Sequence, residues 1–179
     1  PKLYTKKTLN IFFGKTNCQL LSIKKNLVDS IWIKKKDSNT KKFYVLPKNV
    51  VGENYEVKLK KLTTILRNKN VNLQFVTASE NIAWLLNMRG QDSKFTPIPN
   101  SYLLLDSNKK ITLFCNLNKI DFSFKKKFKN IEYVNIDNVD TFLSKIRNKK
   151  ILLDSSSCSM CFENILNKNN KIIEFSDPI

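Results

Sequence analysis

The chain has 179 residues, of which 41% are hydrophobic, and this is enough for one domain with its own core. This composition excludes a disordered tail, and no apolar run approaches the roughly 20 residues that span a bilayer. The formal net charge is +17, from 32 Lys and Arg against 15 Asp and Glu. Clustered cations would suggest nucleic-acid binding. The lysines are instead spread along the whole chain, so we expect a solvated basic surface and no specific nucleic acid.

Before residue 70 the sequence predicts two helices and two short strands. Thr5 can cap a helix over Lys6–Phe13 that ends at Gly14. A longer helix is predicted from Asn54 to about Lys69. Its apolar residues recur at steps of three and four and mark one buried face: Tyr55, Leu59, Leu62 and Leu66. The other segments are the strands Gln19–Ile23 and Phe43–Leu46, a short turn Leu27–Trp32 capped by Asn26, and the charged loop Lys34–Lys42.

Beyond residue 70, strands and helices alternate along the chain. The predicted strands are Leu73–Thr77, Tyr102–Asp106, Ile111–Cys115, Ile131–Ile136, Ile151–Asp154 and Lys171–Phe175. The predicted helices are Glu80–Leu86 with Ser79 as N-cap, Phe122–Phe128, Val139–Arg147 and Cys158–Leu166. This alternation predicts an α/β domain with helices flanking a mixed β-sheet, and an antiparallel hairpin around Ser107–Lys110. No internal repeat is evident.

The absence of histidine restricts the chemistry that the chain can perform. It excludes Ser-His-Asp and Cys-His catalysis and His-bearing zinc sites within these 179 residues. Asp and Glu are scattered and form no acid/base pair, so we identify no catalytic residue and no metal site. Trp32 and Trp84 are expected in the core.

The cysteines are expected to be free thiols in a reducing compartment: Cys18, Cys115, Cys158 and Cys161. Cys158 and Cys161 have the spacing of a thioredoxin-like redox pair, between a predicted strand and the start of a helix. The dipeptide between them is Ser-Met instead of the usual glycine/proline pair. We favour two small apolar side chains at a helix start, and keep the redox module as an alternative.

The segment Asn87–Asp92 combines an arginine with one of the chain's three glycines. We expect Gly90 to end the preceding helix with a positive φ, where a residue without Cβ is favoured. Arg89 and Asp92 are then expected at an exposed loop edge, facing a cleft, a second domain or a partner subunit.

Several blocks of this chain resemble the long, three-domain form of the Xaa-Pro aminopeptidases (aminopeptidase P). The run from Ile82 to Asp92 and the later Ser101-Tyr102 resemble the family block I-x-W-L-x-N-x-R-G-x-D … P-x-x-x-S-Y. Asn26–Trp32 resembles the block N-L-V-D-x-I-W. Pro1–Thr5 is similar to D-P-x-L-H-T, with Tyr4 in the usual His position. Lys34-Lys-Lys-Asp-Ser departs from the family's common R-P and touches a surface loop.

The resemblance implies a creatinase/prolidase-type N-terminal domain, the second of two, which is non-catalytic and spans residues 1–175. Residues 176–179 would begin the linker to a metallopeptidase domain beyond Ile179. That domain would hold two divalent metals, usually manganese, and remove the residue that precedes proline at a peptide's N-terminus.

The resemblance also implies partners and a compartment. We expect contacts with the enzyme's own catalytic and first N-terminal domains, a homodimer, a cytoplasmic location and no membrane. Both ends of the chain are expected to be cuts within a longer protein. The alternatives are a basic nucleic-acid-binding α/β module and a thioredoxin-like domain that uses Cys158 and Cys161.

Overall fold

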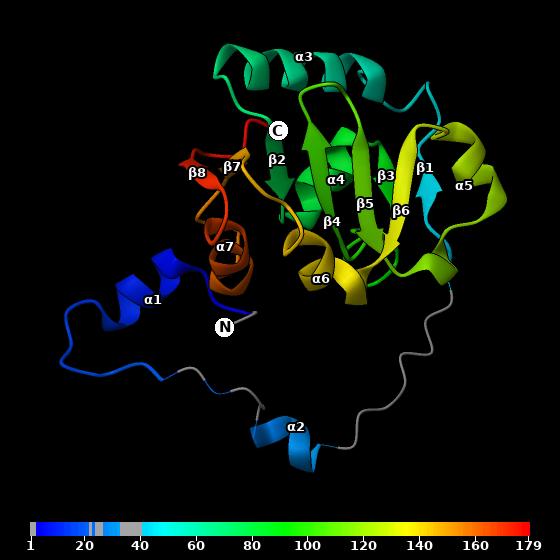
Figure 1. Ribbon diagram of the computed structural model, residues 1–179. Helices are drawn as coiled ribbons and strands as arrows, with labels where there is room; N and C mark the ends of the chain where they lie inside the picture. The colour runs from blue at the N-terminus through cyan, green and yellow to red at the C-terminus, as the bar shows by residue number, and fades with distance from the viewer. Residues whose placement is uncertain (1–2, 22, 24–26, 33–40) are drawn as a thin grey trace.

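The computed structural model describes residues 3–21, 23, 27–32 and 41–179 (Figure 1). The strands are β1 (Tyr44–Val45), β2 (Leu73–Val76), β3 (Met88–Arg89), β4 (Ser101–Asp106), β5 (Ile111–Cys115), β6 (Ile131–Asn135), β7 (Lys150–Leu153) and β8 (Lys171–Glu174). The α-helices are α1 (Lys6–Phe13), α2 (Leu27–Ile31), α3 (Tyr55–Asn68), α4 (Ser79–Leu85), α5 (Phe122–Lys127), α6 (Val139–Leu143) and α7 (Met160–Asn167). Two short 3-10 helices are η1 (Leu117–Lys119) and η2 (Ile136–Asn138).

The main sheet has six strands in the order β6-β5-β4-β2-β7-β8. The pairs β5–β6, β2–β7 and β7–β8 are parallel, whereas β2–β4 and β4–β5 are antiparallel. The β4–β5 hairpin turns on Asp106, whose Oδ1 accepts from the backbone N of Asn108 at 2.6 Å and of Lys110 at 3.1 Å. The prediction of a mixed sheet with this antiparallel hairpin is confirmed.

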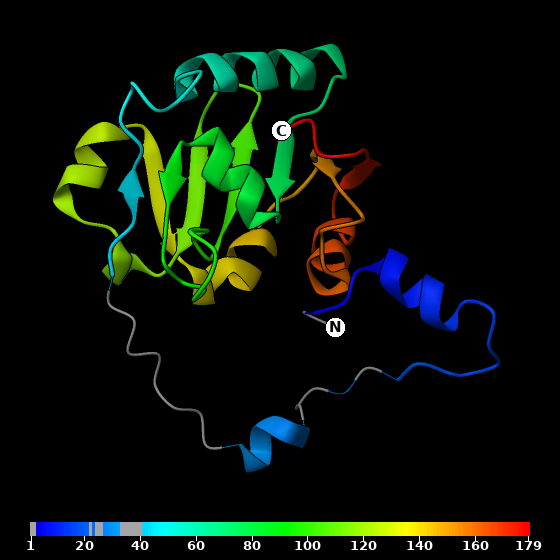
Figure 2. The same ribbon diagram turned by 180° about the vertical axis from the view of Figure 1, so that it is seen from behind.

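Helices cover both faces of the sheet because its strands are apolar on both sides. Alternate residues of a strand point to opposite faces. Leu103 and Leu105 of β4 belong to a core with α3, α4 and α5, whereas Leu104 belongs to a core with α6 and α7. Figures 1 and 2 show these two layers from opposite sides. A second, two-stranded antiparallel sheet of β1 and β3 lies over the first face.

Helix α3 forms where the apolar spacing predicts it. Asn54 caps it, since its Oδ1 accepts from the backbone N of Val57 at 3.4 Å. Leu59, Leu62 and Leu66 are buried, which confirms the predicted inner face.

Several local predictions are wrong at element boundaries. Ser79 does not cap α4: its hydroxyl donates to the carbonyl of Ser101 at 3.2 Å, and Ala78 holds the cap position without a side-chain bond. Helix α7 begins at Met160 instead of Cys158, because Ser159 caps it through the backbone N of Phe162. Helix α6 ends at Leu143, four residues before the predicted end.

The N-terminal predictions have mixed outcomes. Helix α1 and its cap Thr5 are confirmed, with the Thr5 hydroxyl accepting from the backbone N of Thr8 at 3.0 Å. The predicted strand Gln19–Ile23 is wrong at residues 19–21 and 23, which lie in no strand or helix, while Ser22 lies outside the described residues. The predicted cap Asn26 and residues 34–40 of the predicted loop also lie outside them.

The described residues among 3–32 lie beside the domain, and none of them is buried. Figures 1 and 2 show α1 next to α7, with α2 away from the sheet. A bridge joins Thr5 to Ser159, and the backbone N of Met160 donates to the carbonyl of Tyr4 at 2.9 Å. Lys6 Nζ lies 3.6 Å from Glu163 Oε1. The core of residues 41–179 therefore closes without this segment.

Deletion of residues 1–40 should leave the fold intact. We expect the free energy of unfolding to fall by no more than about 2 kcal/mol, because a few backbone bonds and one surface ion pair are lost. Phe75→Ala, which empties part of the core beneath α6 and α7, should cost roughly 3–5 kcal/mol and serves as the comparison. Urea denaturation of the three proteins measures both effects. A shortened chain that fails to fold would show that residues 3–32 belong to the core.

Candidate functional site

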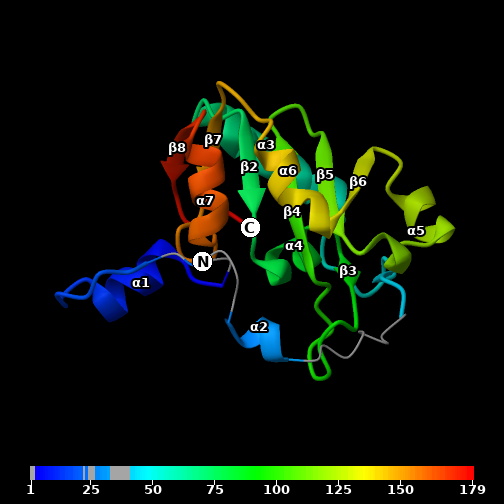
Figure 3. The same cartoon turned by 60° about the horizontal axis from the view of Figure 1, so that its bottom comes forward.

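The segment between α4 and β4 holds the three residues that the sequence singled out. Helix α4 ends at Leu85, and the chain then passes through β3 and a loop of residues 90–100 into β4. Figure 3 shows that this loop projects beyond the end of the sheet. We call residues 90–100 the β3–β4 loop.

The turn after α4 is made by Asn87 and not by Gly90. Asn87 has a φ of 51°, whereas Gly90 has no positive φ, so the predicted role of Gly90 as helix cap is wrong. The Asn87 side chain makes this conformation possible, because its Oδ1 accepts from Lys58 Nζ at 2.6 Å and its Nδ2 donates to the Glu53 carbonyl at 2.9 Å. Asparagine tolerates this region of backbone space better than most residues.

Lys58 is buried on α3 and binds the end of α4. Its Nζ also donates to the Trp84 carbonyl at 2.7 Å and lies 3.9 Å from the centre of the Trp84 ring. Burial lowers the pKa of Lys58, an effect that the nearby carboxylate of Glu53 opposes. Trp84 is 50% exposed and Trp32 is 67% exposed, so the expectation that both lie in the core is wrong. The Trp84 ring covers the ammonium group instead.

Gly90 is glycine for a steric reason. A Cβ at this position would lie 2.8 Å from the Cα of Pro99 and 3.1 Å from Cδ1 of Phe43. Its backbone N donates to the carbonyl of Pro97 at 3.1 Å. The two ends of the β3–β4 loop therefore approach more closely than a side chain would allow.

Arg89 does not lie at an exposed loop edge, and this expectation is corrected. It belongs to β3, opposite Tyr44 of β1, and its side chain is partly buried. Its Nη1 donates to the carbonyls of Ala83 at 3.1 Å and Met88 at 2.8 Å. The guanidinium thus ties the end of α4 to β3.

Asp92 holds the base of the β3–β4 loop through an ion pair that the sequence did not reveal. Its Oδ1 accepts from the Nζ of Lys119, a residue only 4% exposed, and its Oδ2 accepts from the backbone N of Asn100 at 2.6 Å. Lys119 follows β5 in η1, and its carbonyl accepts from the backbone N of Phe43 at 2.9 Å. Nothing in the sequence distinguishes this lysine from the many surface lysines.

The loop carries an exposed aromatic side chain, and its base borders a polar depression. Phe95 is 87% exposed, with the Nζ of Lys94 5.3 Å from its ring centre. A cavity of about 510 Å³ lies against the base of the loop, and its polar lining includes Ser79, Ser93, Thr96, Asn100 and Asn116. Within the part of the chain that the structure describes, no three His, Cys, Asp or Glu side chains gather as a metal site. The arrangement is suited to contact and positioning.

The cysteine pair does not have the environment of a redox site. Cys158 is 1% exposed, and burial raises the pKa of its thiol to about 12. Redox-active cysteines have a lowered pKa and partial exposure, because the thiolate is the nucleophile. Cys161 is partly buried, and all four cysteines are free. The pair therefore gives no support to the thioredoxin-like alternative.

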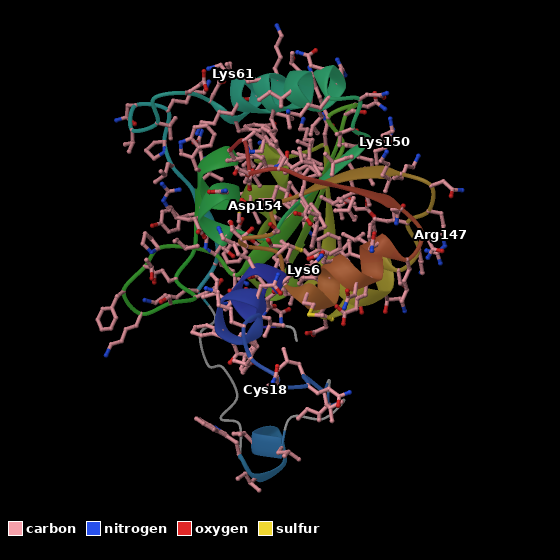
Figure 4. All side chains as sticks on the ribbon, turned by 90° about the vertical axis from the view of Figure 1, so that its left-hand side faces the viewer. Lys6, Cys18, Lys61, Arg147, Lys150 and Asp154 are labelled. Atoms are coloured by element: carbon pink, nitrogen blue, oxygen red, sulfur yellow. The ribbon has the colours of Figure 1, made fainter. Side chains whose placement is uncertain are left out.

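The positive charge is dispersed over the molecule. Figure 4 shows Lys61, Lys150 and Arg147 near different edges of the molecule and Lys6 near the middle of the view. The run Lys125–Lys127 lies exposed on α5. This distribution gives no support to a dedicated nucleic-acid surface. Among the residues described, no helix has the length and apolar character needed to cross a membrane.

A six-stranded mixed sheet with helices on both faces defines an α/β module. The chain belongs to the creatinase/prolidase N-terminal domain family, whose model matches residues 34–179. The family predicted from the blocks around Trp32 and Arg89 is confirmed.

Relatives of known activity are considerably longer than this chain. Xaa-Pro aminopeptidase ApepP of Drosophila melanogaster is 31% identical over 129 residues, which are 70% of this chain and 21% of that protein. Xaa-Pro aminopeptidase 1 of Dictyostelium discoideum is 29% identical over 167 residues, or 86% of this chain and 26% of that protein. The chain thus spans about a quarter or less of the length of these relatives.

Solved structures confirm the expected fold. The cytosolic X-prolyl aminopeptidase from Caenorhabditis elegans, described as having a di-nuclear active site, matches 87% of this chain and 27% of its own. Its TM-score is 0.76 at 22% identity. The creatinase/prolidase-like N-terminal domain of a Corynebacterium diphtheriae metallopeptidase matches 70% of this chain and 98% of its own, with a TM-score of 0.51 at 16% identity.

Gly90→Ala should destabilise the domain by roughly 1–3 kcal/mol, because the new methyl group overpacks against Pro99 and Phe43. Gly52→Ala is the matched control: a Cβ there meets nothing within 4 Å, and little change is expected. Thermal or urea unfolding compares the two variants. Equal stabilities would mean that the β3–β4 loop is not closed against Gly90.

Thiol labelling should distinguish the cysteines by burial. A pKa near 12 leaves roughly one Cys158 thiol in 10⁴ ionised at pH 8, so native Cys158 should resist iodoacetamide. Cys115, whose pKa burial also raises to about 12, should behave likewise, whereas the exposed Cys18 should react first. Raising the pH toward 10 should increase the ionised fraction of Cys158 about a hundredfold. Mass spectrometry of peptides, with and without denaturant, measures each site. Rapid alkylation of native Cys158 would restore the redox alternative.

Proposed function

We propose that this chain is the non-catalytic middle domain of an Xaa-Pro aminopeptidase, an enzyme that removes the N-terminal residue from peptides whose second residue is proline. Membership of the creatinase/prolidase N-terminal family supports this role, as do the named activities of the Drosophila and Dictyostelium relatives. The activity itself is assigned to a catalytic domain that follows Ile179.

The proposed catalytic domain would supply its own metal centre of two divalent ions, with manganese as the proposed metal. The di-nuclear site named for the C. elegans enzyme supports a centre of two ions. No metal-binding cluster occurs in the described ranges of this chain, so the ligands of the proposed metal centre would come from outside them.

The C. elegans enzyme is described as cytosolic, which supports the proposed cytoplasmic location. A homodimer and contacts with both neighbouring domains complete the proposed assembly.

The β3–β4 loop is the proposed contact of this domain with the catalytic cleft or with the partner subunit. The observation that carries this is an exposed Phe95 on a loop whose base is closed at three points. Gly90 N binds the Pro97 carbonyl, and Asp92 binds both Asn100 and the buried Lys119. A loop that is already ordered loses little conformational entropy when it binds. Arg89, Gly90 and Asp92 thus act as positioning residues for Phe95.

The end of the chain is also held firmly, which favours a fixed direction toward the next domain. Asp177 Oδ1 accepts from Gln74 Nε2 at 2.8 Å, and its Oδ2 accepts from Asn81 Nδ2 at 2.8 Å. Its backbone N donates to Asp154 Oδ2 at 3.0 Å. Burial raises the pKa of Asp177 above its usual range, although its amide partners oppose this. Residues 176–179, expected as the start of a linker, are therefore held against the domain, and Ile179 packs against the core that contains α3 and α4.

Phe95→Ala in the complete enzyme should lower kcat/KM for an Xaa-Pro peptide about tenfold, the typical effect of losing one buried aromatic contact. Phe122→Ala is the matched control, because Phe122 is a similarly exposed phenylalanine, 83%, on α5. Sedimentation of both variants distinguishes a cleft contact from a contact needed for assembly. Normal kinetics and assembly for Phe95→Ala would remove the loop from the proposed contact.

The isolated 179-residue chain should show no peptidase activity with added Mn²⁺.

A further inference from the structure

Residues 3–23 expose apolar side chains that belong to neither core of the described part of this domain. We call these residues the N-terminal unit. On α1, Ile11 is 70% exposed and Phe12 is 65% exposed, and no residue of this helix is buried. After the helix, Leu20 and Leu21 are 51% and 77% exposed. Large apolar side chains exposed together in one short segment are typical of an interaction site.

The N-terminal unit repeats the layout of α7 and β8. Each helix has eight residues, and its cap, Thr5 or Ser159, accepts from the backbone N three residues later. Aligning the two caps places Ile11 and Phe12 at the positions of Ile165 and Leu166.

These matched positions have opposite environments. Leu166 is 0% exposed and Ile165 packs against the second core, under the sheet. Ile11 and Phe12 are therefore the residues that would cover a sheet if one lay beneath α1.

The segment after α1 also matches the strand after α7. Gln-Leu-Leu-Ser-Ile at 19–23 has the same order of polar and apolar residues as Lys-Ile-Ile-Glu-Phe at 171–175. The second run forms β8, the edge strand that pairs in parallel with β7. Residues 19–21 lie in no strand or helix. A strand needs a neighbour for its backbone groups, which explains why the predicted strand does not form.

We infer that the N-terminal unit is the closing helix and edge strand of a second α/β domain of this kind, which precedes this one in the same protein. Helix α1 would cover one face of that domain's sheet through Ile11 and Phe12. Residues 19–23 would add a parallel strand to its edge. The corresponding places in this domain are filled by α7 and β8.

Two further observations favour this occupant over a second copy of the chain. The family model begins at residue 34, so it leaves the N-terminal unit outside the domain that it describes. The relatives are more than three times as long as this chain and have room for another domain. The bridge from Thr5 to Ser159 and the ion pair from Lys6 to Glu163 would then be contacts between two domains. This places the start of the present domain after residue 32 and does not depend on any peptidase activity.

Hydrogen exchange tests the inference by comparing the protein of the complete reading frame with the 179-residue chain. Amides of residues 9–13 and 19–23 should exchange at least 100-fold more slowly in the complete protein. Equal rates would overturn the inference. Slow exchange that appears in the short chain and rises with its concentration would assign the surface to a second copy. A reading frame without a folded domain before Pro1 would also overturn it.

A matched pair of substitutions isolates the apolar contact. Phe12→Lys should return exchange at residues 9–13 and 19–23 of the complete protein to the fast rates of the short chain. Asn10→Lys adds the same charge at the position that matches the exposed Asn164 of α7, and should leave the protection unchanged. In the short chain, neither variant should shift the melting temperature. Protection that survives Phe12→Lys would contradict the proposed packing. These readouts are independent of catalysis, so failure of the proposed enzyme function would be recognised separately by an activity assay.

Discussion

A buried lysine and its carboxylate partner determine how the β3–β4 loop is held. Lys119 is 4% exposed, and an ammonium group at that depth is very costly unless it is paired. Asp92 supplies the opposite charge, and its second oxygen binds the backbone of Asn100. Removing one partner of such a pair is costly, because the other charge remains buried. The pair therefore holds η1, which follows β5, against both ends of the β3–β4 loop.

A second buried basic side chain also has polar partners, at the turn that follows α4. Lys58 enters the core from α3 and meets the carbonyl of Trp84 and the amide of Asn87. These bonds fix the end of α4 and stabilise the left-handed backbone at Asn87. Arg89 adds bonds to the carbonyls of Ala83 and Met88. Two basic side chains of a highly basic protein thus act inside the domain as donors to backbone and amide oxygens, and a third, Lys119, pairs with a carboxylate.

The β3–β4 loop and helix α1 present two surfaces that differ in how the rest of the domain holds them. The β3–β4 loop is ordered by its own domain, and its Phe95 is exposed. Helix α1 is ordered locally by its cap, but its apolar residues contact no core within the described residues. The first surface is consistent with recognition by a neighbouring domain or subunit. The second is consistent with a missing part of another domain's core.

The sequence by itself determined the α/β class, most element positions and the family. Apolar periodicity is a local property, and it located α3 by the spacing of Leu59, Leu62 and Leu66. The block around Trp84 and Arg89 identified the family without any structure. It also drew attention to Arg89, Gly90 and Asp92, although Gly90 does not cap the helix and Arg89 does not lie at an exposed loop edge.

Only the tertiary structure decided what those residues do. Gly90 is required by the approach of Pro99, which lies nine residues away, and the positive φ belongs to Asn87. The partner of Asp92 is Lys119, one lysine among many, and its burial depends on the packing of η1 against the β3–β4 loop. The predicted strand at 19–23 failed for the same reason, because a strand exists only where another strand pairs with it. Local patterns specify helices, turns and apolar faces, whereas contacts between distant segments depend on how those faces are brought together.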